Sequence, residues 1–241
     1  MKHLIIIILS VVFSSSVLGQ QLNSIRKSWI KVLSDDLSAR ATTYDTIYTR
    51  YTFDRDVVNI SLEPAWDDHV LNWEPNGVGI RIGFQDYLVK ELTDTSLILE
   101  APAFRRIRFL SEDYMVGKAE LPIQVDSLNG RPVYLADQLI TARYKKGRSL
   151  SKELEPLSHG YNIRKISRLR IAFVVDEKGA IQKTTVLEGI SEGFDSAMAR
   201  GISNTSKKWR PAFYNGKPVQ TLMIFERRFL NSSSVGRTIS N

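Results

Sequence analysis

The stretch 168–230 contains two strand patterns, a helix pattern and a third strand pattern in that order, and it constrains the fold more than any other part of the sequence. Apolar residues alternate with arginine and alanine over 168–173, which is typical of a strand with one buried face. Asp176–Gly179 supplies a polar turn with a glycine for the positive-φ position, and Ile181–Leu187 repeats the strand pattern. These segments predict a β-hairpin.

A helix is predicted directly after this hairpin. Ser191 is placed to cap its first turn, and Glu192 lies where the helix dipole favours a carboxylate. Apolar residues then recur at helical spacing, at Phe194, Ala197, Met198, Gly201 and Ile202. Lys207 and Lys208 follow at the end of the pattern, where positive charge suits the exposed carbonyl groups.

The chain turns back after the helix and ends in a long strand pattern. Trp209 and Pro211 mark the return, Asn215-Gly216 is a turn dipeptide, and Val219–Phe229 alternates as a strand does. Trp209 is interpreted as a core anchor, with ligand stacking as the alternative. Pro211, Asn215 and Gly216 are interpreted as structural residues of the return and the turn.

The segment 160–232 resembles the C-terminal domain of TonB-type energy transducers, through Trp209-x-Pro211-Ala212 and Asn215–Val219. This resemblance implies a small ββαβ fold with the last strand outermost in the sheet. It also implies a periplasmic protein that binds extended peptide segments, including those of outer-membrane transporters, by β-augmentation. Met223, Phe225 and Arg227 are the expected peptide-binding residues. An exposed edge can also pair with a second copy of the chain, so a homodimer is the other expected partner.

The N-terminus has the form of a cleaved signal peptide covering 1–19. A positive Met1-Lys2 start precedes the apolar run Leu4–Phe13, and Val17-Leu18-Gly19 offers a cleavage site. Because a membrane-spanning helix needs about 20 apolar residues, we expect a periplasmic protein with no stable membrane span, and an uncleaved inner-membrane anchor is the alternative. The eight prolines form no spacer of the kind a complete transducer carries, so energy transduction by this chain alone is not expected.

The first half of the chain, 20–125, predicts an all-β antiparallel meander or barrel. Alternating segments separated by turns occur at Ile47–Phe53, Val58–Leu62, Leu71–Trp73, Val78–Ile82, Tyr87–Leu92, Leu97–Leu99 and Phe104–Phe109. Together with Trp29 and Tyr51–Asp54, these segments resemble lipocalin-like domains of exported bacterial proteins. Such a barrel holds a small apolar ligand or is filled by its own aromatic side chains. A ligand carrier is therefore the alternative function.

The two halves differ in charge. Residues 20–125 carry 12 Lys or Arg and 16 Asp or Glu, a net charge of −4, whereas residues 160–241 carry 14 and 6, a net charge of +8. An exported protein rarely meets nucleic acid, so no nucleic-acid partner is expected. The basic half favours an anionic peptide, a transporter segment, a cell-wall polymer or, above all, simple solubility. Between them, 126–159 is predicted as a partly ordered connector with a short helical stretch at Tyr134–Ile140, and 233–241 as a flexible tail.

Catalytic motifs are missing from the sequence. The chain has no cysteine and three histidines, and it contains no phosphate-binding loop and no nucleophile elbow. Asp67-Asp68-His69 is contiguous and therefore a polar turn rather than a set of converging metal ligands. The sequence thus predicts an α+β protein that is not an enzyme and has no catalytic residues, cofactor or metal site.

Overall fold

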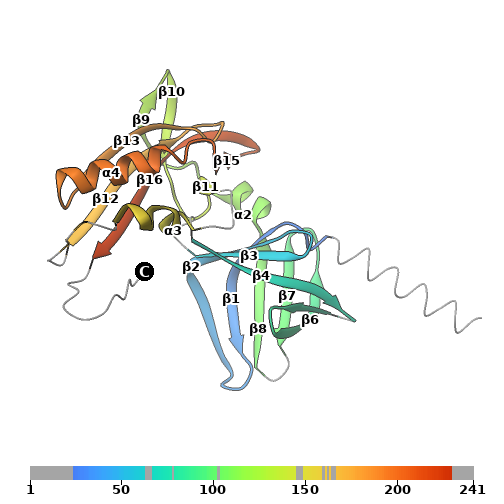
Figure 1. The fold of residues 1–241 in the computed structure, drawn as a ribbon. Helices are drawn as coiled ribbons and strands as arrows, with labels where there is room; N and C mark the ends of the chain where they lie inside the picture. Colours follow the sequence, from blue (N-terminus) through green and yellow to red (C-terminus); the bar gives the residue numbers. More distant parts are fainter. Residues whose placement is uncertain are drawn as a thin grey trace, which may run out of the picture. The chain divides into compact units, whose positions relative to one another are not determined.

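The computed structural model describes residues 24–62, 67–77, 79–101, 104–144, 149–158, 161, 163 and 167–229 (Figure 1). Two compact units divide the chain, one covering Met1–Glu63 and Asp68–Lys118 and the other Pro64–Asp67 and Ala119–Asn241. The fold is mostly β with short helices, as an α+β class with an N-terminal barrel requires. The predicted signal peptide and the predicted tail lie outside the described residues.

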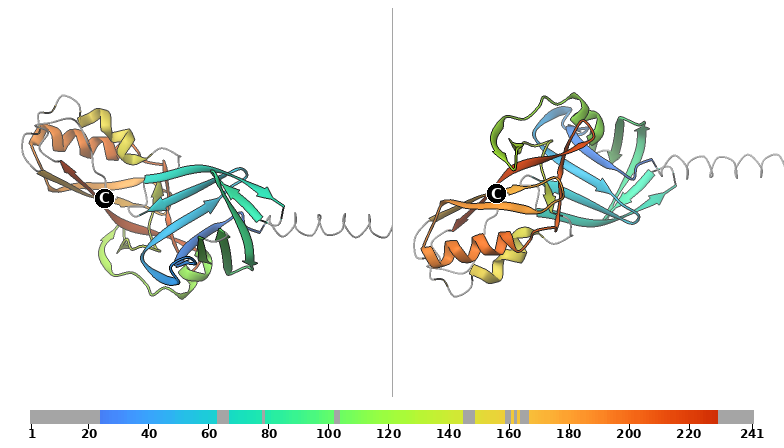
Figure 2. Two further views of the ribbon diagram at one scale, coloured as in Figure 1. Left: turned by 90° about the horizontal axis from the view of Figure 1, so that it is seen from below. Right: turned by 90° about the horizontal axis from the view of Figure 1, so that it is seen from above.

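The first unit is a closed antiparallel barrel, in which β1 pairs with β8 to complete the ring (Figures 1 and 2). Its strands are β1 (Ser28–Asp36), β2 (Ala41–Phe53), β3 (Val57–Leu62), β4 (Asp67–Asn76), β5 (Gly79–Ile82), β6 (Gln85–Leu92), β7 (Ser96–Ala101) and β8 (Arg105–Ser111). The sequence predicted β2 to β8 from alternation and turns. It did not predict β1, in which a bulge between Lys31 and Leu33 interrupts the alternation.

One apolar cluster fills much of the barrel with the chain's own side chains. Its buried members are Ile25, Trp29, Phe53, Val58, Trp73, Ile80, Ile82, Leu97, Leu99, Ile107 and Phe109. The indole of Trp29 donates to the carbonyl oxygen of Ile25 at 2.9 Å, and that of Trp73 donates to Asp54 at 2.9 Å. Both indole N–H groups are therefore used inside the protein rather than offered to a ligand.

A short helix, α2 (Glu112–Lys118), follows β8 directly and places an acidic side chain against the barrel wall. Arg50 Nε and Glu112 Oε1 lie 3.1 Å apart as an ion pair, and the two side chains are only 5% and 11% exposed. Removing one partner of such a buried pair leaves an uncompensated charge, so the pair fixes the position of the helix on the barrel.

The second unit contains a mixed sheet in the order β13-β12-β16-β10-β9, with β15 pairing beside β16. Its strands are β9 (Gln124–Leu128), β10 (Arg131–Leu135), β11 (Arg143–Tyr144), β12 (Ser167–Val175), β13 (Ile181–Glu188), β14 (Trp209–Arg210), β15 (Ala212–Tyr214) and β16 (Lys217–Phe229). The two-stranded pair β11 and β14 lies apart from this sheet. The predicted succession of hairpin, helix and final strand is present as β12, β13, α4 and β16.

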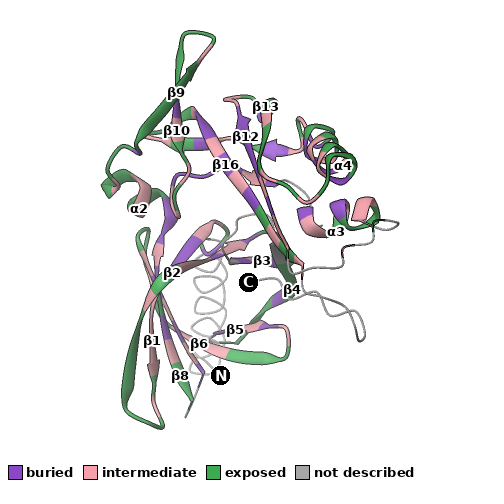
Figure 3. Cartoon of the chain, turned by 90° about the vertical axis from the view of Figure 1, so that its left-hand side faces the viewer, coloured by how far each residue is buried: buried purple, intermediate pink, exposed green. Residues whose placement is uncertain are grey.

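This sheet is curled, so that strands from its two ends approach each other through charged side chains. Lys183 of β13 lies 3.4 Å from Asp126 of β9, and Arg131 of β10 pairs with Glu177 in the turn after β12. The β9–β10 hairpin is exposed over most of its length (Figure 3). Salt bridges therefore join the two ends of the curled sheet, and the described residues of β9 and β13 form no main-chain ladder with each other.

Helices cover one face of the sheet with an apolar core. They are α3 (Leu150–Leu154), the 3₁₀ helix η1 (Glu155–Ser158) and α4 (Glu192–Ser203), which lie along the same side of the sheet (Figure 2). Phe194, Met198 and Ile202 of α4 are fully buried, as the helical spacing predicted. Ser191 occupies the N-cap position, although its side chain makes no capping bond.

The segment 126–159 differs from the predicted connector, because it belongs to the second unit and supplies strands and core residues. β10 pairs in parallel with β16, and Val133, Leu150 and Leu154 are buried. The predicted helical stretch at Tyr134–Ile140 is also wrong. β10 ends there, and the Asp137 carboxylate accepts the N–H groups of Leu139 and Ile140 in a turn.

Within the described ranges, no helix has both the length and the apolar character that a membrane span requires.

Candidate functional site

The two halves of β16 have different neighbours. Gln220–Leu222 pairs with β10 on the side opposite β12, and Lys217–Val219 pairs with β15. Over Met223–Phe229, the described strands pair with β16 only through β12. The expectation of an outermost final strand is therefore wrong for the part of β16 that pairs with β10, because that part lies between β12 and β10. We call Met223–Phe229 the β16 edge.

One hydrogen bond fixes which main-chain groups of the β16 edge face outward. The N–H of Ala136 donates to the carbonyl oxygen of Leu222 at 3.1 Å, so Leu222 directs its main-chain groups away from β12. Because the direction alternates along a strand and the β12–β16 register has no bulge, Ile224, Glu226 and Arg228 also face outward. Met223, Phe225 and Arg227 face β12 instead.

The side chains predicted to contact a peptide lie in other places. Met223 and Phe225 are 3% and 1% exposed and belong to the core under the helices. Arg227 is partly buried, with its guanidinium 5.2 Å from the centre of the Phe229 ring. The sequence already indicated that Met223 and Phe225 are buried, because they share one face of an apolar-rich strand with Thr221. The polar residues Glu226 and Arg228 were the better candidates.

Three arginines surround a single carboxylate beside the β16 edge. Glu226 lies 3.8 Å from Arg168, 3.6 Å from Arg170 and 3.4 Å from Arg228. Arg168 also donates to Glu188 at 2.8 Å, which raises the pKa of its guanidinium. The five side chains are between 33% and 62% exposed. With three positive and two negative charges, the cluster keeps a net positive charge near the edge.

The residues predicted to be structural lie where the chain turns back from α4 into β16. Trp209 is fully buried, donates to the Thr205 hydroxyl at 3.0 Å and packs edge-on against Tyr144 at 5.2 Å between ring centroids. Asn215 and Gly216 both have positive φ, as a tight hairpin turn between β15 and β16 requires. Pro211 stands between β14 and β15, where no ladder hydrogen bond is needed.

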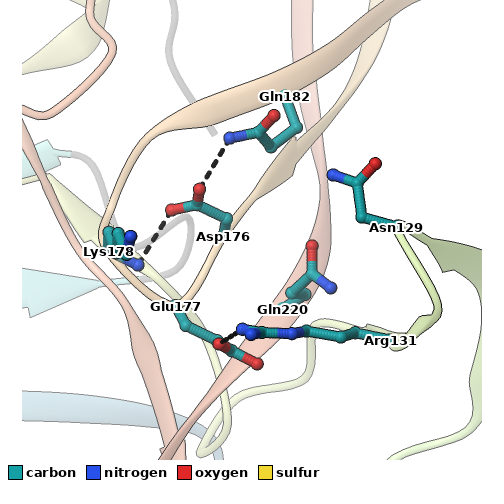
Figure 4. A pocket seen from close by; sticks show the side chains of 7 residues that line it. All are labelled: Asn129, Arg131, Asp176, Glu177, Lys178, Gln182 and Gln220. Atoms are coloured by element: carbon teal, nitrogen blue, oxygen red, sulfur yellow. Dashed lines mark hydrogen bonds and ion pairs between the residues drawn. The ribbon is translucent and has the colours of Figure 1, made fainter.

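A polar pocket of about 240 Å³ opens where the curled sheet closes (Figure 4). Its lining consists of Asn129, Arg131, Asp176, Glu177, Lys178, Gln182 and Gln220. Arg131 reaches Glu177, and Asp176 accepts from Gln182 at 2.6 Å and from the Lys178 N–H at 2.8 Å (Figure 4). Two acidic and two basic side chains thus balance within the lining. The pocket presents neither an apolar wall nor an unpaired carboxylate to an incoming molecule.

The described residues contain no group of three or more His, Asp or Glu side chains arranged around a metal position. No protein-family model, no curated protein and no solved structure matches this chain. The resemblance to TonB C-terminal domains and to lipocalin-like domains therefore stays a prediction from sequence.

Proposed function

We propose that this chain is an exported, non-enzymatic adaptor of the periplasm, and that its second unit binds an extended peptide by adding it to the β16 edge. The observation that carries the proposal is the outward direction of Ile224, Glu226 and Arg228 beyond the end of β10. An unpaired strand edge is a template for another strand, and its N–H and C=O groups bind any extended main chain.

The peptide expected at this edge is acidic. The three arginines Arg168, Arg170 and Arg228 outnumber the two acids, Glu226 and Glu188, with which they pair. A negative side chain beside the edge therefore gains attraction from the remaining positive charge. The TonB-like sequence words make an exposed segment of an outer-membrane transporter the proposed source of the peptide. In that case the chain acts in TonB-linked transport as a partner of the transporter.

A pair of proline variants tests the main-chain contact. Ile224→Pro removes an outward N–H without removing a bond to β12, and it should weaken peptide binding by roughly fivefold or more. Val186→Pro is the matched control on β13, at the opposite edge of the sheet, because Val186 is paired with Ile171, whose main-chain groups face β16. It should leave the affinity unchanged.

The measurement is calorimetric titration with synthetic transporter-derived peptides, using circular dichroism to verify the fold of each variant. Peptides with their acidic residues replaced by amides test the charge preference, and added salt should weaken only the acidic ones. Equal affinities of the two proline variants, with both correctly folded, would exclude the β16 edge as the binding site.

A further inference from the structure

The polar pocket at the closure of the curled sheet is bordered by segments that lie far apart in the sequence. Asn129 belongs to the turn between β9 and β10, Gln182 to β13 and Gln220 to β16. The ion pair between Arg131 and Glu177 joins the β9–β10 hairpin to the turn after β12. The sheet and this ion pair therefore hold the walls of the pocket together.

Gln220 is a buried polar residue whose carboxamide oxygen opens into the pocket. It is only 4% exposed, and its Nε2 donates to the carbonyl oxygen of Leu128 at 3.3 Å. Its Oε1 accepts no hydrogen bond from the described residues and is not among their fully enclosed polar atoms. Figure 4 shows this oxygen directed into the space that Asn129 and Gln182 also border. A buried carboxamide oxygen without a donor costs free energy, so the position favours a donor from outside the protein.

Two more carboxamides face the same space. The Asn129 side chain makes no hydrogen bond within the described part of the chain, and its amide group points into the pocket (Figure 4). Gln182 donates to the Asp176 carboxylate at 2.6 Å and keeps its own oxygen for another partner. Because each carboxamide has two N–H donors and one acceptor oxygen, the three side chains surround the pocket with donors and acceptors that the protein uses only in part.

The charged side chains of the lining give the pocket no net charge. Arg131 pairs with Glu177, and Lys178 is exposed. The two oxygens of Asp176 accept the Lys178 N–H at 2.8 Å and the Gln182 amide at 2.6 Å. A charged ligand would meet a like charge as well as an opposite one, whereas an uncharged polar ligand meets only hydrogen-bonding groups.

We propose that this pocket binds one ring of an uncharged saccharide. Its volume of about 240 Å³ is that of about eight water molecules at about 30 Å³ each, which is room for a pyranose ring. A sugar hydroxyl both donates and accepts, as a carboxamide does, so the hydroxyl groups around the ring pair with Asn129, Gln182 and Gln220. The seven described lining residues offer no apolar wall for stacking. The affinity is therefore weak, because hydrogen bonds exchanged with water add little net free energy.

A nuclear magnetic resonance titration of the isotope-labelled full chain detects weak binding at this position. The probes are glucose, galactose and mannose, each compared with its uronate. At least one uncharged sugar should shift the side-chain NH₂ signals of Asn129, Gln182 and Gln220 together. The uronate of that sugar should bind no more tightly, because the lining carries no net charge. No shift of these signals with any of the three sugars, or tighter binding of the uronate, would overturn the proposal.

Two Asn-Gly turns provide a matched pair of variants. Asn129→Gly removes a carboxamide from the pocket and keeps the positive φ of 55° that the turn requires, so it should weaken sugar binding at least about threefold. Asn215→Gly is the control, because Asn215 has a φ of 48° in the turn between β15 and β16 and does not line the pocket. Gln182→Met removes a second carboxamide from an exposed side chain and should cause a similar loss.

Binding that is equally tight in Asn129→Gly and Asn215→Gly, and unchanged in Gln182→Met, would contradict the assignment of the pocket. The pocket shares no residue with the β16 edge. The outcome is therefore independent of peptide binding there.

Discussion

The two units of this chain differ in their strand edges, which are all paired in the barrel and partly unpaired in the second unit. Every strand of the barrel has neighbours on both sides, because β1 and β8 close the ring. The sheet of the second unit ends at β13 and β9, and β16 has a neighbour on one side only over Met223–Phe229. A closed barrel offers a partner only side chains, whereas an open sheet also offers its main chain. A partner can therefore pair with main-chain groups in the second unit, where strand edges are open.

The largest expected effect separates a core residue of the second unit from an exposed one. Trp209→Ala should lower the free energy of unfolding by about 3–5 kcal/mol, because a fully buried indole and its hydrogen bond are lost. Phe213→Ala is the control on the adjacent strand, since Phe213 is 44% exposed. Chemical denaturation followed by near-ultraviolet circular dichroism measures both. A Trp209 variant as stable as the Phe213 variant would contradict the described core.

Ion pairs give a second contrast between the units. Arg50→Met should destabilise the barrel by about 3 kcal/mol, because Glu112 stays buried without its guanidinium. Arg168→Met in the second unit should cost less than about 1 kcal/mol, since Arg168 and Glu188 are 39% and 43% exposed. Chemical denaturation of both variants at low and high salt measures the two losses of stability. Similar losses in the two variants would mean that Arg50 and Glu112 are solvated.

Two glycines of the second unit distinguish backbone strain from a steric clash. Gly130 and Gly179 both have positive φ, so alanine at either should cost about 1 kcal/mol. A Cβ at Gly130 would meet nothing within 4 Å, whereas at Gly179 it would lie 2.0 Å from the carbonyl oxygen of Trp209. Gly179→Ala should therefore cost roughly 1–3 kcal/mol more than Gly130→Ala in thermal denaturation. Equal losses of stability in the two variants would mean that the Trp209 backbone lies farther from Gly179 than described.

The smallest effect at neutral pH concerns the barrel alone. Because burial raises the pKa of Tyr51 to about 12 in the folded chain, folding favours the protonated phenol. Its contribution is complete below pH 10 and decreases as pH rises towards 12, by up to about 2 kcal/mol. Tyr51→Phe should flatten this alkaline loss of stability, whereas the exposed Tyr44→Phe should not. An unchanged alkaline decline in Tyr51→Phe would place the phenol in water.

Local signals in the sequence predicted much of the fold. Turn dipeptides such as Asn215-Gly216 and the apolar spacing of α4 depend on neighbours along the chain, and the structure contains both. β1 was missed because its bulge breaks the alternation. β10 was missed because its pairing with β16 joins segments far apart in sequence, which no local pattern encodes.

The candidate sites were less accessible to sequence reasoning. The alternation of β16 identified two faces, but the direction of its N–H groups depends on the register with β12 and on the bond from Ala136 to Leu222. Met223 and Phe225 were therefore chosen for the wrong side of the strand.

The position of β16 has a consequence for the order in which the protein becomes structured. The barrel uses strands that are complete at Ser111, so it can close while the remaining residues are still being synthesised. β16 is the last described strand, yet it lies between β12 and β10. Until it arrives, two hairpins made earlier have exposed edges, which are prone to aggregation. Arrival of the last strand therefore limits how soon the second unit folds, and a chaperone is most needed in that interval.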